Sequence, residues 1–183
     1  EAGRLNRNII GLASSVDGGK TWTDHGIVVG QNNGLDATGA WSPSALVQGS
    51  EIWVYYHTNE PGPRILRTRM NANGWQKITT EVVRMPSLQY FVSNVDVSMD
   101  GRKFVMLANT TDLKNIVRYV SDDGLNWALD SKTPDEYLIR GGVNSVLTPH
   151  REMIDGNHYR IYFGYDSGGG SQSIQQWEFA VSP

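Results

Sequence analysis

A hairpin pattern recurs at nearly regular intervals along this chain. In each of three copies, an apolar segment, a tight turn and a second apolar segment follow one another, and the turns contain Gly49, Gly101 and Gly156, which are 52 and 55 residues apart. The flanking segments are rich in β-branched and aromatic residues, which is typical of two antiparallel strands joined by a turn. A repeat of this length indicates that one unit of β-structure is used several times.

A second series of turns lies between these hairpins. The segments 15–22 (SVDGGKTW) and 121–127 (SDDGLNW) share a Ser, an Asp, a Gly and a closing Trp, and 71–75 (NANGW) is a shorter version. In each segment, Asp or Asn can bond to the backbone of its own turn and Gly can adopt positive φ. Two alternating kinds of hairpin give four strands per repeat, which is the composition of a β-propeller blade.

The sequence therefore predicts an all-β fold, a β-propeller of four-stranded antiparallel blades with about three to four blades present. A β-sandwich would not need a repeat of this length. We expect one propeller domain over residues 1–183, incomplete at its N-terminus. Its predicted parts are an outer half blade (1–30), two blades (31–85 and 86–140) and a partial blade (141–183).

Composition excludes several classes of function. Sixteen Lys and Arg against nineteen Asp and Glu give a net charge of −3, too balanced for a nucleic-acid or anionic membrane surface. Without Cys there is no disulfide, thiolate zinc site or cysteine nucleophile. No His/Asp cluster has metal-ligand spacing, so we expect no metal and no cofactor. The location stays undetermined, with a secreted or periplasmic one favoured.

Several short motifs resemble those of known propellers. The full turn 15–22 resembles the Asp box of sialidases and many other propellers, and 121–127 resembles the form in five-bladed glycoside hydrolases of the invertase, arabinanase and β-xylosidase type. The segment 40–44 (AWSPS) is similar to that group's Trp-Ala-Pro-Asp motif, and 95–101 (VDVSMDG) resembles its strand that carries an inner-rim Asp. The resemblance implies that the chain is part of a five-bladed propeller.

In that group, catalysis takes place in a funnel at the propeller axis. One Asp acts as base or nucleophile, a Glu acts as general acid, and a further Asp tunes the pKa of the acid. Such chemistry requires two carboxyl groups with different pKa values. In this sequence the first Asp has no matching position, the Asp of the Trp-Ala-Pro-Asp motif is replaced by Ser44, and the general-acid position near Leu147 or Thr148 holds no acid.

Three acidic residues are the candidate catalytic groups. Asp96 alternates with Val95 and Val97 on a predicted inner strand, so it is either a carboxylate that faces the axis or a structural Asp that bonds the backbone of a neighbouring blade. Glu152 is the acid nearest to the general-acid position, or else half of an ion pair with Arg151 or a nearby Lys. Asp36 lies in a loop before an inner strand, where it contacts ligand or caps a turn.

Five further residues are candidates for substrate binding. A Trp can stack on a pyranose ring or pack between blades, and a lone His can bond a sugar or fill a structural role. Polar side chains beside the candidate acids can bond sugar hydroxyls. The predicted binding residues are Trp41, Ser44, His57, Asn94 and His150.

These observations predict a carbohydrate-active propeller similar to glycoside hydrolases, which hydrolyses or binds glycosidic substrates with carboxylate acid/base chemistry. The expected partner is an oligo- or polysaccharide, with self-association or a missing N-terminal segment completing the ring. One alternative is a non-catalytic carbohydrate-binding or adhesion module. A third is a sialidase, which would need three converging arginines drawn from Arg64, Arg67, Arg69, Arg118, Arg140 and Arg151.

Overall fold

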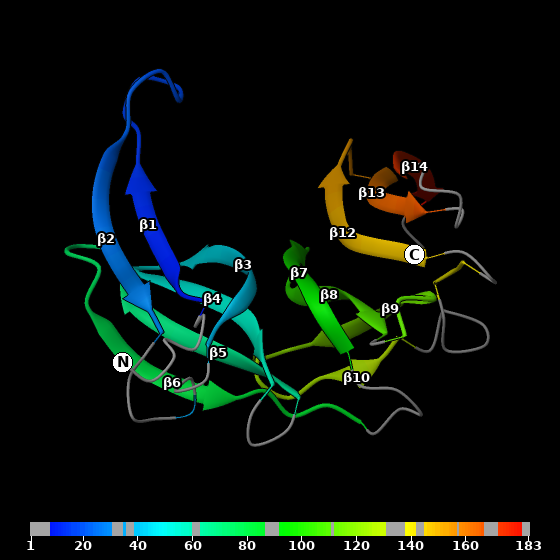
Figure 1. The fold of residues 1–183 in the computed structure, drawn as a ribbon, viewed down its shortest axis with the longest axis horizontal. Helices are drawn as coiled ribbons and strands as arrows, with labels where there is room; N and C mark the ends of the chain where they lie inside the picture. Colours follow the sequence, from blue (N-terminus) through cyan, green and yellow to red (C-terminus); the bar gives the residue numbers. More distant parts are fainter. Residues whose placement is uncertain are drawn as a thin grey trace, which may run out of the picture. The chain divides into compact units, whose positions relative to one another are not determined.

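The structure is a computed structural model, and its described part consists of strands, turns and loops without a helix (Figure 1). It describes residues 8–30, 35, 39–59, 63–86, 92–110, 112–130, 138–141, 145–156, 158–166 and 172–180. Contacts divide the chain into two compact units, Glu1–Val82 and Val83–Pro183. The all-β class and the hairpins predicted from the sequence are confirmed.

Unit 1 contains a two-stranded ribbon and a four-stranded antiparallel sheet. The ribbon is β1 (Ile10–Ser14) with β2 (Thr23–Val29), and the sheet follows the order β3 (Trp41–Gln48), β4 (Glu51–Thr58), β5 (Arg64–Asn71) and β6 (Lys77–Val82). The order equals the chain order, as in a propeller blade. One core joins ribbon and sheet and contains Ile10, Val29, Ala40, Val54, Tyr56, Leu66 and Met70.

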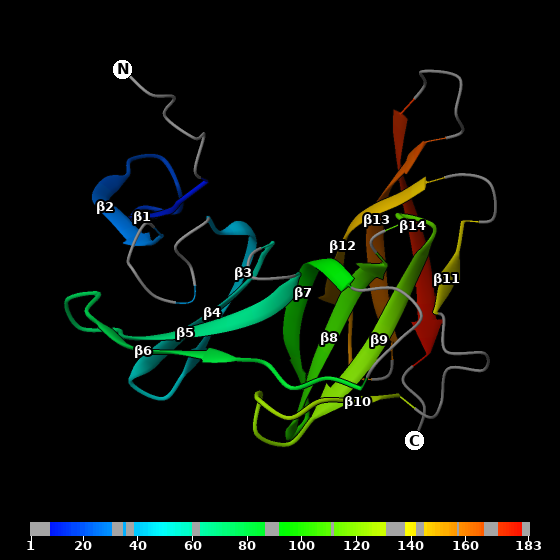
Figure 2. The same cartoon turned by 60° about the horizontal axis from the view of Figure 1, so that its bottom comes forward.

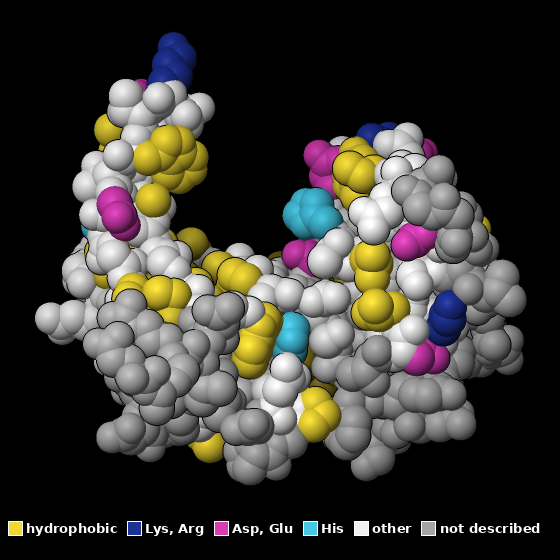
Figure 3. All heavy atoms as spheres, viewed as in Figure 1, with side chains coloured by type: hydrophobic (Ala, Val, Ile, Leu, Met, Phe, Trp, Pro, Cys, Tyr) yellow, Lys and Arg dark blue, Asp and Glu magenta, His cyan; other side chains and the backbone are white. Residues whose placement is uncertain are grey.

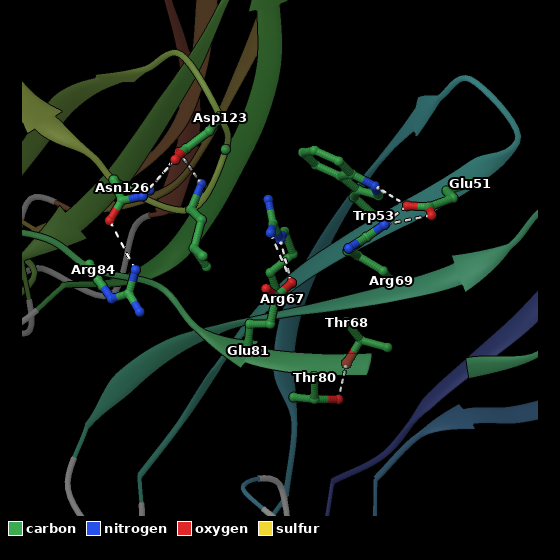
Figure 4. A network of polar contacts seen from close by, with 12 residues as sticks. Glu51, Trp53, Arg67, Thr68, Arg69, Thr80, Glu81, Arg84, Asp123 and Asn126 are labelled. Atoms are coloured by element: carbon green, nitrogen blue, oxygen red, sulfur yellow. Dashed lines mark hydrogen bonds and ion pairs between the residues drawn. The ribbon is translucent and has the colours of Figure 1, made fainter. Parts of the chain in front are cut away.

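A polar network covers part of the β4–β5–β6 surface of unit 1 (Figure 4). Glu51 accepts hydrogen bonds from the indole N–H of Trp53, at 2.8 Å, and from the Arg69 guanidinium, at 2.6 and 2.7 Å. These bonds lower the pKa of Glu51 to about 2. The Arg67 guanidinium lies 4.3 Å from the centre of the Trp53 ring and pairs with Glu81 at 2.8 Å. The network joins adjacent strands through their side chains.

Unit 2 contains two antiparallel sheets (Figure 2). The first has the order β10 (Ala128–Leu129), β9 (Asn115–Ser121), β8 (Lys103–Thr110) and β7 (Val92–Asp100), and β11 (Ile139–Arg140) also pairs with β9. The second has the order β12 (Ser145–Met153), β13 (His158–Asp166) and β14 (Gln172–Ala180). Their shared core contains Leu107, Ile116, Ile139, Val146, Tyr159, Ile161 and Phe163.

The two Asp-containing turns have the local hydrogen bonds that the sequence suggests. Asp17 accepts from the backbone N–H of Lys20 and Thr21 and from the Thr21 hydroxyl, and these bonds lower its pKa to about 2. Asp123 accepts from Leu125 and Asn126 in the same way, and its pKa is also lowered. Both carboxylates are used within their own turns, so the contacts fit a structural role.

A buried arginine joins the two sheets of unit 2. The Arg151 side chain on β12 is fully buried and bonds three successive residues of β7: the Ser98 hydroxyl at 3.2 Å, the Met99 carbonyl at 3.3 Å and the Asp100 carboxylate at 2.9 Å. Its guanidinium also lies 4.6 Å from the centre of the Tyr159 ring. Burial lowers the pKa of Arg151, and the charge of Asp100 opposes this shift. The β12–β7 contact thus depends on one compensated buried charge.

Replacing Arg151 by Met should destabilise the chain by about 3–5 kcal/mol, because Asp100 then loses a buried partner. Arg160 is a matched control, since its ion pair with Glu178 is partly exposed, and Arg160→Met should cost far less because water screens an exposed ion pair. Urea unfolding followed by Trp fluorescence measures both values. Equal losses in the two variants would contradict this role for Arg151.

Candidate functional site

The same backbone irregularity occurs near the start of β3, β7 and β12. In each strand the pairing register shifts by one residue, because two residues face a single partner residue: between Trp41 and Ser44, between Ser93 and Asp96, and between Leu147 and His150. The first of the two unpaired residues has positive φ in all three: Ser42 (50°), Asn94 (46°) and Thr148 (42°). A bulge of this kind redirects the side chains that follow it and is common beside functional sites.

The residues that follow the bulges are Ser44, Asp96 and His150, and each was a candidate site residue. The sequence signal for the bulges is weak. Ser42 and Thr148 precede a proline, which restricts their backbone, but Asn94 precedes a valine. Each of the three residues is the first paired residue after the bulge in its strand. The sequence motifs alone did not show this equivalence.

In unit 2, the structure brings Asp96 and His150 together. Asp96 Oδ1 lies 3.4 Å from His150 Nδ1, and Asp96 Oδ2 accepts the backbone N–H of Arg151 at 2.8 Å. The Asp96 side chain is 15% exposed and the His150 side chain 66%. Figure 3 shows histidine and acidic side chains next to one another on the surface over β7 and β12. The imidazole therefore has one nitrogen toward a carboxylate while most of its side chain is open to solvent.

Glu152 lies on the same face of β12 as His150, and Tyr162 connects them. The Tyr162 ring stacks on His150, with ring centres 6.5 Å apart, and the Tyr162 hydroxyl donates to Glu152 at 3.1 Å. Arg160 donates to the Tyr162 hydroxyl at 3.1 Å. Tyr162 was not predicted as a site residue, although its alternation with Arg160 on a predicted strand could have placed it there.

The alternative in which Glu152 forms an ion pair with Arg151 is wrong. Neighbouring residues on a strand point to opposite faces, and Arg151 points into the core toward Asp100, whereas Glu152 stays exposed. Asn94 lies at the β7 bulge, two residues before Asp96. Asp36 lies outside the described residues and stays a prediction.

Unit 1 holds the other predicted binding residues. Trp41 and His57 are cross-strand partners on β3 and β4, and their rings stack at 5.5 Å with an interplanar angle of 19°. A Cβ on Gly39 would lie 2.9 Å from the Trp41 ring, so only glycine fits there. His57 therefore covers the Trp41 ring, which leaves less of it for stacking on a sugar. Ser44 pairs with Tyr55 on β4 directly after the bulge.

The environment of His57 differs from that of His150. His57 is half-buried, and burial lowers its pKa, which favours the neutral imidazole. A neutral imidazole stacked on an indole serves packing. His150 is exposed and faces a carboxylate, which is the arrangement that supports proton transfer.

Other kinds of site find no support among the described residues. No group of three or more His, Asp or Glu in the described part of the chain could hold a metal ion. Four of the six arginines considered for a sialidase triad pair with carboxylates of their own unit: Arg67, Arg69, Arg118 and Arg151. The described residues contain no helix long and apolar enough to cross a membrane.

Solved structures with similar folds include several carbohydrate-active enzymes. A thermostable family-43 glycoside hydrolase matches with a TM-score of 0.69 at 13% identity, over 94% of this chain and 66% of the other. The endo-arabinase of Bacteroides thetaiotaomicron matches with a TM-score of 0.67 at 13% identity, over 96% of this chain and 68% of the arabinase. The endo-1,4-beta-xylanase of the same organism matches with a TM-score of 0.61 at 14% identity, over 78% of this chain and 55% of the xylanase.

The chain has the fold of the β-propeller glycoside hydrolases. The resemblance inferred from the motifs is confirmed at this level. No protein-family model matches the sequence, and no curated protein matches it. The chain spans between about half and two thirds of the length of these three propellers, and at such identities the likeness concerns the fold.

The lowered pKa of His57 predicts a pH-dependent stability. In the unfolded chain a histidine titrates near ~6.5, so the unfolded state binds more protons than the folded state below that pH. The free energy of unfolding should therefore be highest above about pH 6.5 and fall as the pH drops below it. His57→Phe keeps a ring against Trp41 but removes the proton site, so it should flatten this dependence. Urea unfolding at several pH values tests it; an unchanged slope in His57→Phe would contradict it.

Proposed function

We propose that this chain is part of a carbohydrate-active propeller that hydrolyses glycosidic bonds at the surface around Asp96 and His150. The observation that carries the proposal is the Asp96–His150 contact, in which a carboxylate lies against Nδ1 of a solvent-open imidazole. The propeller fold shared with glycoside hydrolases supports the substrate class. A carboxylate that orients a histidine is a common arrangement for general acid–base chemistry.

In the proposed reaction, protonated His150 gives a proton from Nε2 to the oxygen of the departing sugar as its bond to the anomeric carbon breaks. Water then adds to the anomeric carbon and transfers a proton back to the neutral imidazole. Asp96 keeps Nδ1 protonated and stabilises the imidazolium. This assigns to His150 the role that a carboxylic acid fills in most glycoside hydrolases.

Glu152 has a secondary role in this proposal. Its carboxylate accepts the Tyr162 hydroxyl and lies on the same face as His150, so it can bond a sugar hydroxyl beside the reacting bond. Asn94 and Ser44 stay predicted binding residues. Arabino- and xylo-oligosaccharides are the first substrates to test, because two structures of this fold are named endo-arabinase and endo-1,4-beta-xylanase.

A second candidate is a propeller that binds carbohydrate without cleaving it. The observation that favours it is Leu147, which stands near the predicted general-acid position and packs beside Gly164. An apolar side chain there cannot donate a proton. Binding on a glycan array without release of reducing ends would select this candidate.

Asp96→Asn should lower the hydrolysis of oligosaccharides by about a hundredfold or more, because the imidazole loses its charged partner. Asp155→Asn is a matched control, since Asp155 also lies beside a histidine, His158 at 3.2 Å, but in an exposed turn. Reducing-end assays on both variants compare the two pairs. Full activity in Asp96→Asn would show that this pair is not the site.

His150→Ala should affect substrates according to their leaving group. An oligosaccharide leaves as a strongly basic alkoxide and needs a proton, whereas a nitrophenyl group leaves readily without one. We expect a loss of about 10²–10⁴-fold with oligosaccharides and a much smaller loss with nitrophenyl glycosides. Comparing the initial rates of both substrate types measures this; equal losses would rule out His150 as the acid.

A further inference from the structure

A buried amide lies between the bulges that carry the two proposed groups. Asn109 on β8 is fully buried. Its side-chain N–H donates to the Val146 carbonyl and its side-chain oxygen accepts the Thr148 N–H at 2.7 Å. Val146 and Thr148 are the residues on either side of Leu147, at the start of the β12 bulge. The side-chain donor and acceptor of Asn109 therefore both bond the backbone of β12, just before His150.

The backbone of Asn109 is tied to the other bulge. Asn109 pairs with Ser93 on β7, and the register slip that leads to Asp96 begins directly after Ser93. One residue thus pairs through its backbone beside the β7 bulge and binds the β12 bulge through its side chain. The Val146 N–H also donates to the carbonyl of Leu113, in the turn between β8 and β9, at 2.7 Å. Both backbone groups of Val146 therefore bond to the first sheet or to that turn.

The two bulges need such a partner for physical reasons. Thr148 and Asn94 both have positive φ, which is unfavourable for residues other than glycine and persists only where the surroundings fix it. β12 is also the edge strand of its sheet, and its outer backbone groups would otherwise lack partners. The side-chain amide of Asn109 donates to a carbonyl and accepts from an N–H two residues further along β12. An ionised carboxylate has no donor, and a hydroxyl offers its donor and acceptor only from one oxygen.

We propose that Asn109 is a positioning residue that sets the distance between Asp96 and His150. The proposal rests on the proposed function of that pair and adds a residue that touches neither substrate nor the reacting atoms. Without the amide, the β12 bulge loses its fixed backbone, and the imidazole no longer stays against Asp96.

The charged and titratable groups that face the His150 ring can all affect its titration and its NMR shifts. They are Asp96 from β7, Tyr162 from β13 and Glu152 from its own strand, with Arg160 bonded to Tyr162. Arg151 points away, toward Asp100. Asn109 itself does not titrate, so any change in His150 after its replacement comes through geometry.

The test compares Asn109→Leu and Asn109→Ala with a control on the same strand. Asn109→Leu keeps a similar size without adding a charge, but it removes the donor to Val146 and the acceptor for Thr148. The control is Thr110→Val, because Thr110 is equally buried and its hydroxyl accepts the Asn115 N–H at 3.1 Å within the β8–β9 turn. Urea unfolding of all three variants separates a loss of stability from a loss of position.

The first readout is independent of catalysis. The ¹⁵N NMR shifts of the His150 ring, followed across pH in the full chain, should change in both Asn109 variants toward those of Asp96→Asn, and stay unchanged in Thr110→Val. Unchanged His150 shifts in Asn109→Leu, or equal changes in the control, would overturn the proposal. If Asn109→Ala does not fold, Asn109→Leu, which is similar in size and uncharged, decides.

The second readout is kinetic. A displacement of the imidazole by about 1 Å should lower kcat by about a hundredfold, with KM little changed and the pH profile altered. If the wild-type chain shows no hydrolysis, the proposed function fails, while the NMR comparison still decides whether Asn109 holds the pair. If hydrolysis occurs and the Asn109 variants keep their kcat and pH profile, the positioning role is wrong.

Discussion

The structure of unit 2 depends on how the edge of β12 is satisfied. An edge strand has one row of backbone groups without a partner in its own sheet, and such groups are costly to bury. Here the neighbouring sheet supplies side chains in place of a further strand. Asn109 bonds the backbone of Val146 and Thr148, and Asp96 accepts the N–H of Arg151. The buried Arg151 guanidinium holds the same strand to β7 from the core side.

In the proposed function, this arrangement lets one carboxylate serve both structure and chemistry. Sequence reasoning treated Asp96 either as a functional group or as a structural Asp that bonds a neighbouring backbone. Its two oxygens divide these tasks, because Oδ2 bonds the Arg151 amide and Oδ1 faces His150. A carboxylate fixed by a backbone donor holds its position without a flexible partner, and fixed geometry is what proton transfer requires.

Local patterns predicted the strands, the turns and the repeat. The hairpins around Gly49 and Gly101 appear where glycine and alternating apolar residues indicate them, because both signals act within a few residues. The pairing of β11 with β9 was not predicted, since β11 has only two residues. The contact of Asp96 with Arg151 joins residues 55 positions apart, and no local pattern encodes such a distance.

The sequence pointed to the residues of the proposed site but not to the contacts between them, for the same reason. Asp96, Glu152 and His150 were chosen from strand register and motif likeness, but their connection through Tyr162 and the use of Asn109 follow only from packing between sheets. The bulges at Ser42, Asn94 and Thr148 escaped prediction because positive φ is rare outside glycine. Two of them precede proline, which is a useful but incomplete signal.

The central claim is that the surface around Asp96 and His150 recognises carbohydrate. Its most direct test is amide chemical-shift mapping of the full chain during titration with arabino- and xylo-oligosaccharides. The account predicts that the largest shifts fall in 94–98 on β7 and 148–152 on β12, with Tyr162 among the residues affected. Saturable shifts confined to other regions, such as the β1–β2 turn, or no saturable shifts with any sugar tested, would contradict it.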